Sequence, residues 1–126
     1  MPYVWVSSNV AASSVAVTPA MQAISKALAG ALSKPEAVVM VHLDLDQHMF
    51  FAASDAPCAM IRLRSIGKVD PEHNPTTAAA LTAVVSEALS VPADRIFMNL
   101  DDVDRTNWAK GGNLVLAPSS LPPAST

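Results

Sequence analysis

The sequence of 126 residues has little cysteine, little glycine and no dense group of basic residues. Its single cysteine, Cys58, cannot form an internal disulfide, so nothing in the sequence requires an oxidising compartment. The 8 Lys and Arg are scattered among 11 Asp and Glu, so we expect no nucleic acid and no membrane as a partner. No apolar run approaches the roughly 18 residues that span a bilayer, and no secretory signal pattern is present. We expect a cytoplasmic protein, with secretion by a non-classical route left open.

Apolar residues are abundant and charged residues are few. Apolar residues make up 51% of the chain and charged residues 15%, which is typical of one globular domain with a substantial core. We place this domain at residues 1–116. The final residues, 117–126, are rich in Pro and Ser, and we expect them to form a disordered tail.

Two rounds of strand, helix and strand follow one another along the chain. Thr18-Pro19 and Asn74-Pro75 each combine a capping side chain with a proline, so each is expected to start a helix. Pro35 is expected to end the first helix, and the apolar run behind it predicts a strand buried on both faces. The expected strands are residues 2–10, 37–45, 59–66 and 95–100.

The two rounds are related by an offset of 57 residues, which carries the Leu-Ser-x-Pro at Leu32 onto that at Leu89 and Val4 onto Ile61. We therefore predict an α+β fold in which two βαβ units form one mixed four-stranded sheet with both helices on one face. The other face of that sheet is expected to be apolar and bare in a monomer. Since a bare apolar sheet face is too large a patch for a soluble protein, we expect a homo-oligomer.

Pro2 stands directly behind Met1 at the start of the first expected strand. If Met1 is removed, Pro2 carries a secondary α-amine. An α-amine titrates at about 7.7–8.0, and burial or a nearby cation lowers its pKa, so such an amine is a candidate general base. The alternative is a proline that is merely tolerated at a chain end, and position alone favours that alternative.

Lys34 and the turn after the third strand are two further candidates. Lys34 lies on the bend after the first helix. It is either a solvated charge or an ammonium that lowers the pKa of the Pro2 amine and stabilises a developing enolate or carboxylate. The segment Ser65-Ile66-Gly67-Lys68 either offers a backbone N–H to an anion or is an ordinary turn.

The other polar positions carry weaker signals. Asp44, Asp46 and His48 stand at every second position, a spacing that would place three possible metal ligands on one face of a strand. A solvated loop end is nevertheless favoured over a metal site. Trp108 either lines a pocket or anchors a subunit contact. No chemical role is expected for the acidic turn and the remaining candidates, which are Asp101, Asp102, Asp104, His73 and the apolar Cys58.

Several short motifs occur together in one order along the chain. They are Met1-Pro2, Lys34-Pro35, Pro57-Cys58-Ala59, Ser65-Ile66-Gly67-Lys68, Pro92-Ala93-Asp94-Arg95 and a late Trp108. As an ordered set they resemble the macrophage migration inhibitory factor family of the tautomerase superfamily, from residue 1 to about residue 108. The resemblance implies a homotrimer of duplicated units.

The resemblance also implies an activity, which is keto–enol tautomerisation of phenylpyruvate-like and dopachrome-like acids, with no cofactor and no metal. Pro2 would move the proton, and Lys34 with the backbone of Ile66 would hold the substrate carboxylate. Asn99 would reach the pocket from the neighbouring subunit. The implied site residues are Pro2 and Lys34 as catalytic residues and Lys34, Ile66, Phe97, Asn99 and Trp108 as substrate-binding residues.

The sequence departs from the family pattern at several places. Phe97 stands where the family usually has Tyr, which keeps an aromatic wall and removes a hydroxyl donor. Cys58 lacks the second cysteine of the family's Cys-x-x-Cys, so thiol–disulfide chemistry is not expected. Ala11-Ala12 replace an arginine of the animal cytokines, and residues 109–113 differ from the family's C-terminal segment, which contributes to subunit contacts.

Three hypotheses of function follow from these observations. The first is a tautomerase with Pro2 as its base. The second is a cytokine-like or host-directed protein that binds a cell-surface receptor and retains weak or vestigial tautomerase activity. The third is a trimer that serves only as a scaffold.

Overall fold

Strand β1 (Pro2–Ser8) lies in the interior of a four-stranded sheet with the order β2-β1-β3-β4. The computed structural model describes residues 1–115, so the tail expected at 117–126 lies outside the described residues. The other main elements are α1 (Val17–Leu32), β2 (Met40–Asp44), β3 (Ala59–Ser65), α2 (Asn74–Leu89) and β4 (Ile96–Asp102). The short elements are η1 (Ala12–Ser14), η2 (Glu36–Val38), η3 (Ala93–Arg95), η4 (Arg105–Asn107), β5 (Ala109–Lys110) and β6 (Asn113–Leu114).

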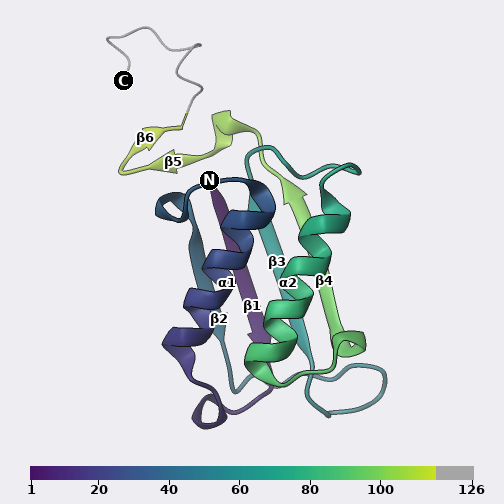
Figure 1. The fold of residues 1–126 in the computed structure, drawn as a ribbon. Helices are drawn as coiled ribbons and strands as arrows, with labels where there is room; N and C mark the ends of the chain where they lie inside the picture. Colours follow the sequence, from purple (N-terminus) through teal and green to yellow (C-terminus); the bar gives the residue numbers. More distant parts are fainter. Residues whose placement is uncertain (116–126) are drawn as a thin grey trace, which may run out of the picture.

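The sheet is mixed, and both long helices cover the same face of it (Figure 1). β1 pairs with β2 in parallel, β3 pairs with β4 in parallel, and β1 pairs with β3 antiparallel. Each parallel pair encloses one helix in the chain, α1 in the first pair and α2 in the second. The predicted arrangement of two βαβ units is therefore confirmed.

The two units repeat at the offset of 57 residues that the sequence indicated. The bounds of β1, α1 and η2 map onto those of β3, α2 and η3 at this offset. The residues after the two helices, Ser33 and Ser90, are both left-handed, with φ of 53° and 56°. At the junction of the units, Val4 lies opposite Leu63 and Val6 opposite Ile61. These pairs lie symmetrically about an approximate two-fold axis between β1 and β3.

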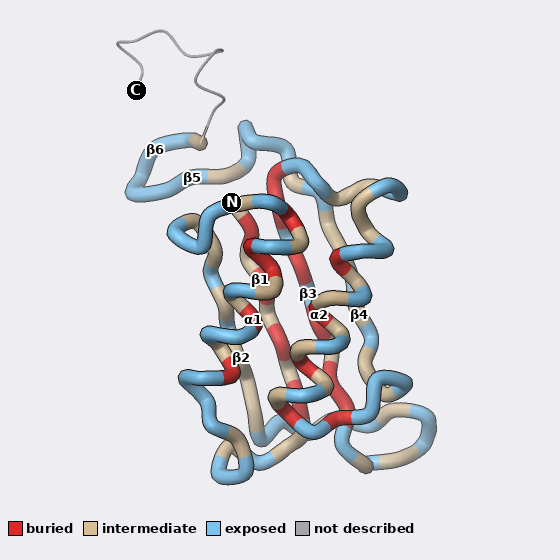
Figure 2. The backbone as a smooth tube through the Cα atoms, in the orientation of Figure 1, coloured by how far each residue is buried: buried red, intermediate tan, exposed pale blue. Residues whose placement is uncertain are grey.

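The core lies between the sheet and the two helices (Figure 2). Every second residue of β1 and β3 is buried, as expected for strands with one covered face. The helices contribute residues at a spacing of three or four, which matches one face of an α-helix. The fully enclosed core residues include Val4, Val6, Ile24, Leu28, Leu32, Ile61, Leu63, Leu81 and Val85.

Both helix starts differ from the prediction. α1 begins at Val17, so Thr18 is not its N-cap and Pro19 is its third residue. α2 begins at Asn74 with His73 at the capping position. Proline is tolerated at these places because none of the first four N–H groups of a helix has a partner within the helix. The Asn74 amide oxygen instead accepts a hydrogen bond from the backbone N–H of Asp70 at 3.1 Å.

The strand expected at 37–45 is shorter than predicted and is not buried on both faces. Residues 36–38 form the 3₁₀ turn η2, and β2 is an edge strand whose residues are exposed or half-buried. Met40 is 65% exposed. An edge strand with an exposed apolar side chain is a site at which another chain can pair.

The sheet face opposite the helices, here called the open face, is mixed rather than apolar. Alternation places Tyr3, Trp5, Met40, Met60 and Phe97 on it together with several polar residues. The Arg62 guanidinium lies 4.5 Å from the Trp5 ring centroid, and the Trp5 ring stacks on His42 at 5.2 Å. The predicted bare face therefore exists, but charged groups interrupt its apolar surface.

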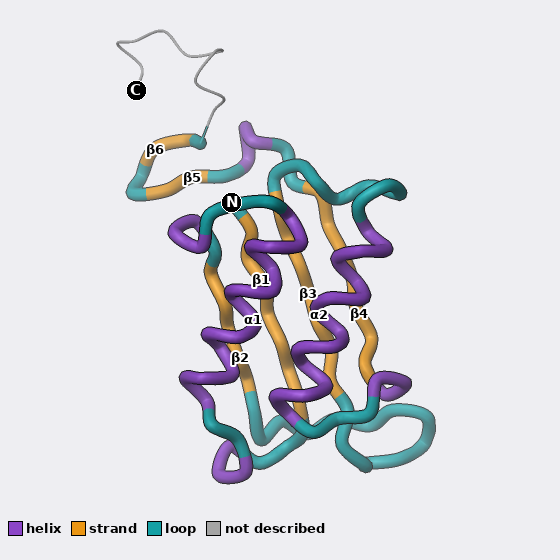
Figure 3. Tube along the Cα trace, in the orientation of Figure 1, coloured by secondary structure: helices purple, strands orange, loops and turns teal. Residues whose placement is uncertain are grey.

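The chain between β2 and β3 is a long loop (Figure 3), and Arg95 of η3 holds it. Arg95 donates hydrogen bonds of 2.9 to 3.2 Å to the carbonyl oxygens of Phe51, Ser54, Ala56 and Pro57. Its guanidinium also lies 5.2 Å from the centre of the Phe51 ring. This side chain therefore fixes the path of a loop that has almost no regular structure. None of the helices in residues 1–115 is long and apolar enough to cross a membrane.

Candidate active site

Lys34 connects the end of α1 to the end of β3. Ser33 turns the chain out of the helix in the left-handed region, and the Lys34 backbone N–H donates to the carbonyl of Ala29 at 2.9 Å. The bend directs the Lys34 side chain to the sheet, where Nζ donates to the carbonyl oxygen of Ile66 at 2.7 Å. The predicted position of Lys34 on a bend is confirmed, and the lysine is engaged with the sheet rather than free in solvent.

The N-terminal amine lies next to this lysine. Pro2 is fully buried at the start of β1, and Met1 precedes it. Burial, the Lys34 ammonium and the charge of Arg105 together lower the pKa of the Met1 α-amine from 8.0 to about 6. Each cause acts against the charged form of the amine. An amine with this pKa is largely neutral at neutral pH and is able to accept a proton.

A pocket of about 500 Å³ opens beside the amine. Its walls come from three segments, which are the start of β1, the chain that leads into β2, and the β5–β6 hairpin that lies beside the N-terminus (Figure 1). No acidic side chain is among the lining residues. These residues are Met1, Pro2, Tyr3, Ala37, Val38, Val39, Met40, Trp108, Ala109, Lys110 and Gly111. The pocket is therefore apolar with a basic margin, which suits an organic acid with an apolar body.

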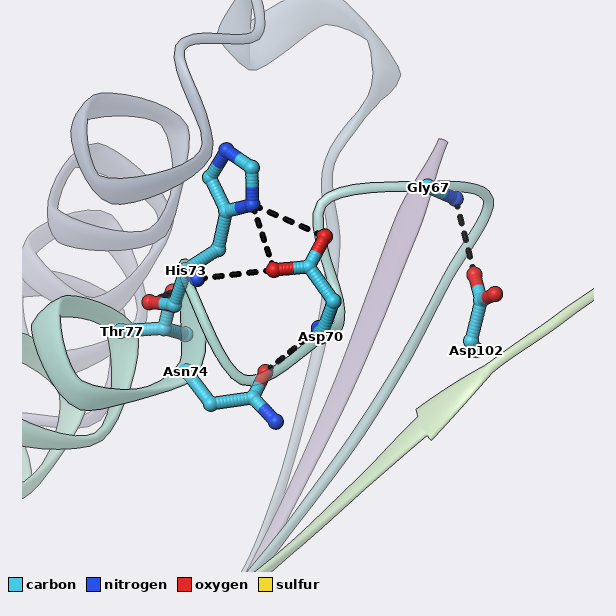
Figure 4. A network of polar contacts seen from close by, with 6 residues as sticks. All are labelled: Gly67, Asp70, His73, Asn74, Thr77 and Asp102. Carbon is cyan, nitrogen blue, oxygen red and sulfur yellow. Dashed lines mark hydrogen bonds and ion pairs between the residues drawn. The ribbon is translucent and has the colours of Figure 1, made fainter.

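The turn after β3 already binds a carboxylate of its own chain. Gly67 has φ +73°, which glycine adopts readily, and Lys68 follows with φ 65°. The Gly67 N–H donates to Asp102 Oδ1 at 3.1 Å (Figure 4). The sequence predicted either an anion-binding N–H or an ordinary turn. In this structure the Gly67 N–H binds an anion, and the anion is the side chain of Asp102.

Phe97 and Asn99 lie away from this pocket. Both are on β4 and face the open side of the sheet, and neither lines the pocket beside Pro2. Phe97 is 61% exposed, with its ring centroid 4.5 Å from that of Phe51. Asn99 is in register with Arg62. Within one chain, then, Pro2 and Trp108 share the pocket, Lys34 and Ile66 meet beside it, and Phe97 and Asn99 do not join them.

Sequence reasoning missed part of the pocket. Val39 and Met40 were assigned only to a buried strand, although both line the pocket. Lys110 of the hairpin and Arg105 of η4 were given no role, yet Lys110 lines the pocket and Arg105 affects the amine. The pair Gly111-Gly112 after Lys110, with φ of 59° and 87°, was a usable signal for a tight hairpin.

The acidic residues predicted to form a solvated turn lie at the end of β4 and just after it, where they are exposed or half-buried. Asp101 pairs with Arg64 at 3.0 Å, and Asp102 accepts from Gly67. Asp104 Oδ1 accepts from the Thr106 hydroxyl at 2.6 Å and from the Thr106 backbone N–H at 2.9 Å, and these two hydrogen bonds lower the pKa of Asp104. Each of the three carboxylates therefore has a structural partner.

The other predicted candidates have local contacts. Within residues 1–115, Asp44, Asp46 and His48 do not converge, and the one group of three possible metal-ligating residues is Asp70, Glu72 and His73. His73 Nδ1 lies 2.7 Å from Asp70 Oδ1, which also accepts from the His73 backbone N–H at 2.8 Å, so the ring, expected to be inert in a loop, is held by Asp70 at the start of α2 (Figure 4). Cys58 is 2% exposed and free, as predicted for a small buried residue.

Comparison with known proteins identifies the family. The family described as "Macrophage migration inhibitory factor (MIF)" matches residues 1–116. A macrophage migration inhibitory factor homolog from Brugia malayi is 32% identical over 90% of this chain and 97% of its own length. The macrophage migration inhibitory factor of Meriones unguiculatus is 34% identical over the same shares.

Solved structures agree with this assignment. The macrophage migration inhibitory factor of Trichinella spiralis superposes with a TM-score of 0.85 at 26% identity, over 90% of this chain and 99% of that chain. The factor from Toxoplasma gondii gives a TM-score of 0.81 at 33% identity, over the same shares. The shared fold is the two-helix, mixed four-stranded sheet described above. The chain therefore belongs to the macrophage migration inhibitory factor family of the tautomerase superfamily.

Proposed function

We propose that the protein is a tautomerase that interconverts the keto and enol forms of phenylpyruvate-like acids, and of dopachrome-like acids, without a cofactor. The observation that carries this proposal is the N-terminal amine. In the chain with Met1, burial and Lys34 lower the pKa of this α-amine to about 6, and it lies beside an apolar pocket, an environment that the Pro2 amine would enter once Met1 is removed. A base that is neutral near pH 7 and held beside an organic acid is suited to proton abstraction.

In the proposed reaction, Met1 has been removed and the Pro2 nitrogen is the base. The nitrogen takes a proton from the carbon next to the ketone, the C–H bond breaks, and the electron pair forms the enolate. The protonated amine then gives this proton to the enolate oxygen, which completes the enol and regenerates the base. The reverse sequence returns the ketone, so no oxidant, reductant or cofactor is needed.

Lys34 is proposed to bind the substrate carboxylate and to stabilise the enolate. An ammonium has three N–H donors, and the Ile66 carbonyl takes one of them in this structure. The others are available to a substrate oxygen, where a positive charge is most effective as negative charge develops. Trp108 and the residues of the pocket wall are proposed to contact the apolar part of the substrate.

We further propose that the working form is a homotrimer, and that Phe97 and Asn99 reach the pocket of a neighbouring subunit. Two features support assembly, the edge strand β2 with its exposed Met40 and the open face with exposed Phe97. Assembly would explain why two of the expected substrate-binding residues lie on β4, away from Pro2.

The proposal is tested with purified protein and phenylpyruvate. Intact mass first establishes whether Met1 is present, because only a chain that begins at Pro2 has the proposed base. Pro2→Gly is expected to abolish enolisation, and Lys34→Ala to lower kcat/KM by about 100-fold or more, since a positioned charge acts on the transition state. A Pro2→Gly protein with full activity would refute the proposal.

A second candidate function is cytokine-like signalling through a cell-surface receptor, from outside the cell. It is favoured by the names of the relatives, which refer to inhibition of macrophage migration. Receptor binding that is unchanged in Pro2→Gly would support a signalling role separate from catalysis. A folded protein with no turnover and no receptor binding would instead favour a scaffold.

A further inference from the structure

Ser8 and Ser65 occupy equivalent positions in the two repeated units. Ser8 is the last residue of β1 and Ser65 the last residue of β3, and the offset of 57 residues carries one onto the other. Both residues are completely buried, with 0% exposure. The approximate two-fold axis places them at opposite ends of the β1–β3 pair, so the hydrogen-bond partners of the two hydroxyl groups can be compared directly.

The Ser8 hydroxyl has a complete set of partners. It donates to the carbonyl oxygen of Cys58 at 2.7 Å and accepts from the Val10 N–H at 3.2 Å. The Cys58 N–H in turn donates to Asn9 Oδ1 at 2.9 Å. At this end of the sheet, side chains therefore satisfy the peptide groups around the start of β3.

The Ser65 hydroxyl has no such partner. Its Oγ atom is buried and makes no hydrogen bond within residues 1–115. Leaving a buried hydroxyl unpaired costs about 1–3 kcal/mol, and buried polar groups in folded proteins are nearly always paired. An unpaired hydroxyl at one end of a repeat, whose counterpart is fully paired at the other end, calls for a specific explanation.

The register of the sheet identifies what lies opposite Ser65. Ser8 is paired with Ala59, whose preceding residue Cys58 accepts the Ser8 hydrogen bond. Ser65 is paired with Pro2, and the residue before Pro2 is Met1. The acceptor that satisfies Ser8, the carbonyl oxygen of Cys58, thus corresponds to the carbonyl oxygen of Met1 at the other end. A chain that begins at Pro2 lacks this carbonyl group, and the residue directly opposite Ser65 is then Pro2 with its free amine.

We propose that Ser65 is a positioning residue for Pro2, and that its Oγ accepts a hydrogen bond from the Pro2 nitrogen once Met1 has been removed. The inference rests on the proposed function. A neutral proline amine has one N–H and one lone pair, so an acceptor that holds the N–H fixes the direction of the lone pair. Because Pro2 lines the pocket, the lone pair is then directed at the substrate.

The test compares Ser65→Ala with Ser8→Ala. Ser65→Ala is expected to lower kcat about tenfold with little change in KM, because the base is misdirected and the substrate contacts remain. The acidic limb of the kcat/KM profile is expected to move to lower pH, since a hydrogen bond to the protonated amine no longer favours the charged form. Ser8→Ala is expected to lose stability and to keep the wild-type kcat and pH profile.

A third variant separates hydrogen bonding from packing. Ser65→Cys preserves the volume of the side chain but replaces the hydroxyl with a weak acceptor. Rates and a pH profile that match Ser65→Ala support the hydrogen bond. A Ser65→Cys protein that matches the wild type overturns it, because volume alone would then explain the effect.

The failure of this inference is distinguishable from the failure of the proposed function. If Pro2→Gly abolishes activity while Ser65→Ala keeps the wild-type kcat and pH profile, the tautomerase stands and the inference is overturned. If the wild type has no activity, acylation of the N-terminal amine is measured against pH by mass spectrometry, on the chain that begins at Pro2. This measurement decides whether Ser65 forms a hydrogen bond with the amine. A lower midpoint in Ser65→Ala supports the hydrogen bond, and an unchanged midpoint overturns it.

Discussion

Lys34 Nζ and the carbonyl oxygen of Ile66 are 2.7 Å apart, although the two residues are separated by 32 positions in the chain. This hydrogen bond ties the end of α1 to the end of β3 and holds a positive charge beside the N-terminal amine. Because the amine and the ammonium repel one another when both are charged, the amine loses its proton more readily. The Lys34 ammonium thus lowers the pKa of the amine that lies beside the pocket.

The first prediction concerns the charge of Lys34. In a chain that keeps Met1, Lys34→Met is expected to raise the pKa of the Met1 α-amine from about 6 part of the way to 8.0, because burial, the largest cause of the shift, remains. The pH dependence of N-terminal acylation measures this change. Lys26→Met removes an exposed lysine of α1 and is the matched control, for which no change is expected. An unaltered midpoint in Lys34→Met would contradict the assigned interaction.

The second prediction concerns acid stability. Hydrogen bonds from the backbone N–H and the ring of His73 lower the pKa of Asp70 below 3.8. The unfolded chain therefore binds a proton at higher pH than the folded chain does. The stabilisation is present above about pH 4 and is lost as the pH falls through the lowered pKa of Asp70.

Asp70→Asn tests this expectation. The variant is expected to have a lower Tm than the wild type at neutral pH, and the difference is expected to shrink as the solution is made acidic. Tm values measured in a pH series give the result, and Glu87→Gln on the exposed side of α2 is the control. A difference in Tm that stays constant down to the most acidic point would argue against the linkage.

The third prediction concerns the loop between β2 and β3. Arg95→Gln removes most of the hydrogen bonds to four carbonyl groups and is expected to lower the free energy of unfolding by about 2 kcal/mol. Amide exchange in residues 51–57 is expected to accelerate more than exchange in β1. The control is Arg64→Gln, whose exposed ion pair with Asp101 is expected to contribute less than about 1 kcal/mol. Equal effects of the two variants would show that Arg95 has no special role in the loop.

The fourth prediction concerns assembly. Met60 lies on the open face next to Arg62 in β3, so Met60→Lys introduces a further positive charge into the proposed interface. The variant is expected to dissociate to monomers, which light scattering coupled to size-exclusion chromatography would detect. Lys26→Glu on α1, outside the open face, should leave the oligomer intact. A Met60→Lys protein with the wild-type mass would exclude the open face as the interface.

Much of the fold was predictable from the sequence because it depends on local patterns. Alternation in residues 59–65 and the helical spacing of Leu81, Val85 and Leu89 each report one buried face. The internal repeat added long-range information, since two similar units must satisfy similar packing. Helix starts were less predictable, because proline fits several positions in the first turn, and Thr18 and Pro19 were each placed too early in the helix.

The candidate site was predictable only in part. Pro2 and Lys34 were identified by their positions in a strand start and a bend, and by the family resemblance. Lys110 and Arg105 were missed because a hairpin brings them close to the N-terminus, and no local pattern records a contact between the two ends of a domain. Asp102 was assigned to a solvated turn because its partner, the Gly67 N–H, is 35 residues away.

The sequence by itself determined the two βαβ units, their offset of 57 residues and the residues of the core, because hydrophobic periodicity is a local property of the chain. Only the tertiary structure decided that Ser8 is paired while its equivalent Ser65 is not, and that the amine at residue 1 has a pKa of about 6. Burial and charge act through space between segments that are distant in the chain. A repeat in sequence therefore gives two similar ends of a sheet, and the contacts across the fold make one of them the candidate active site.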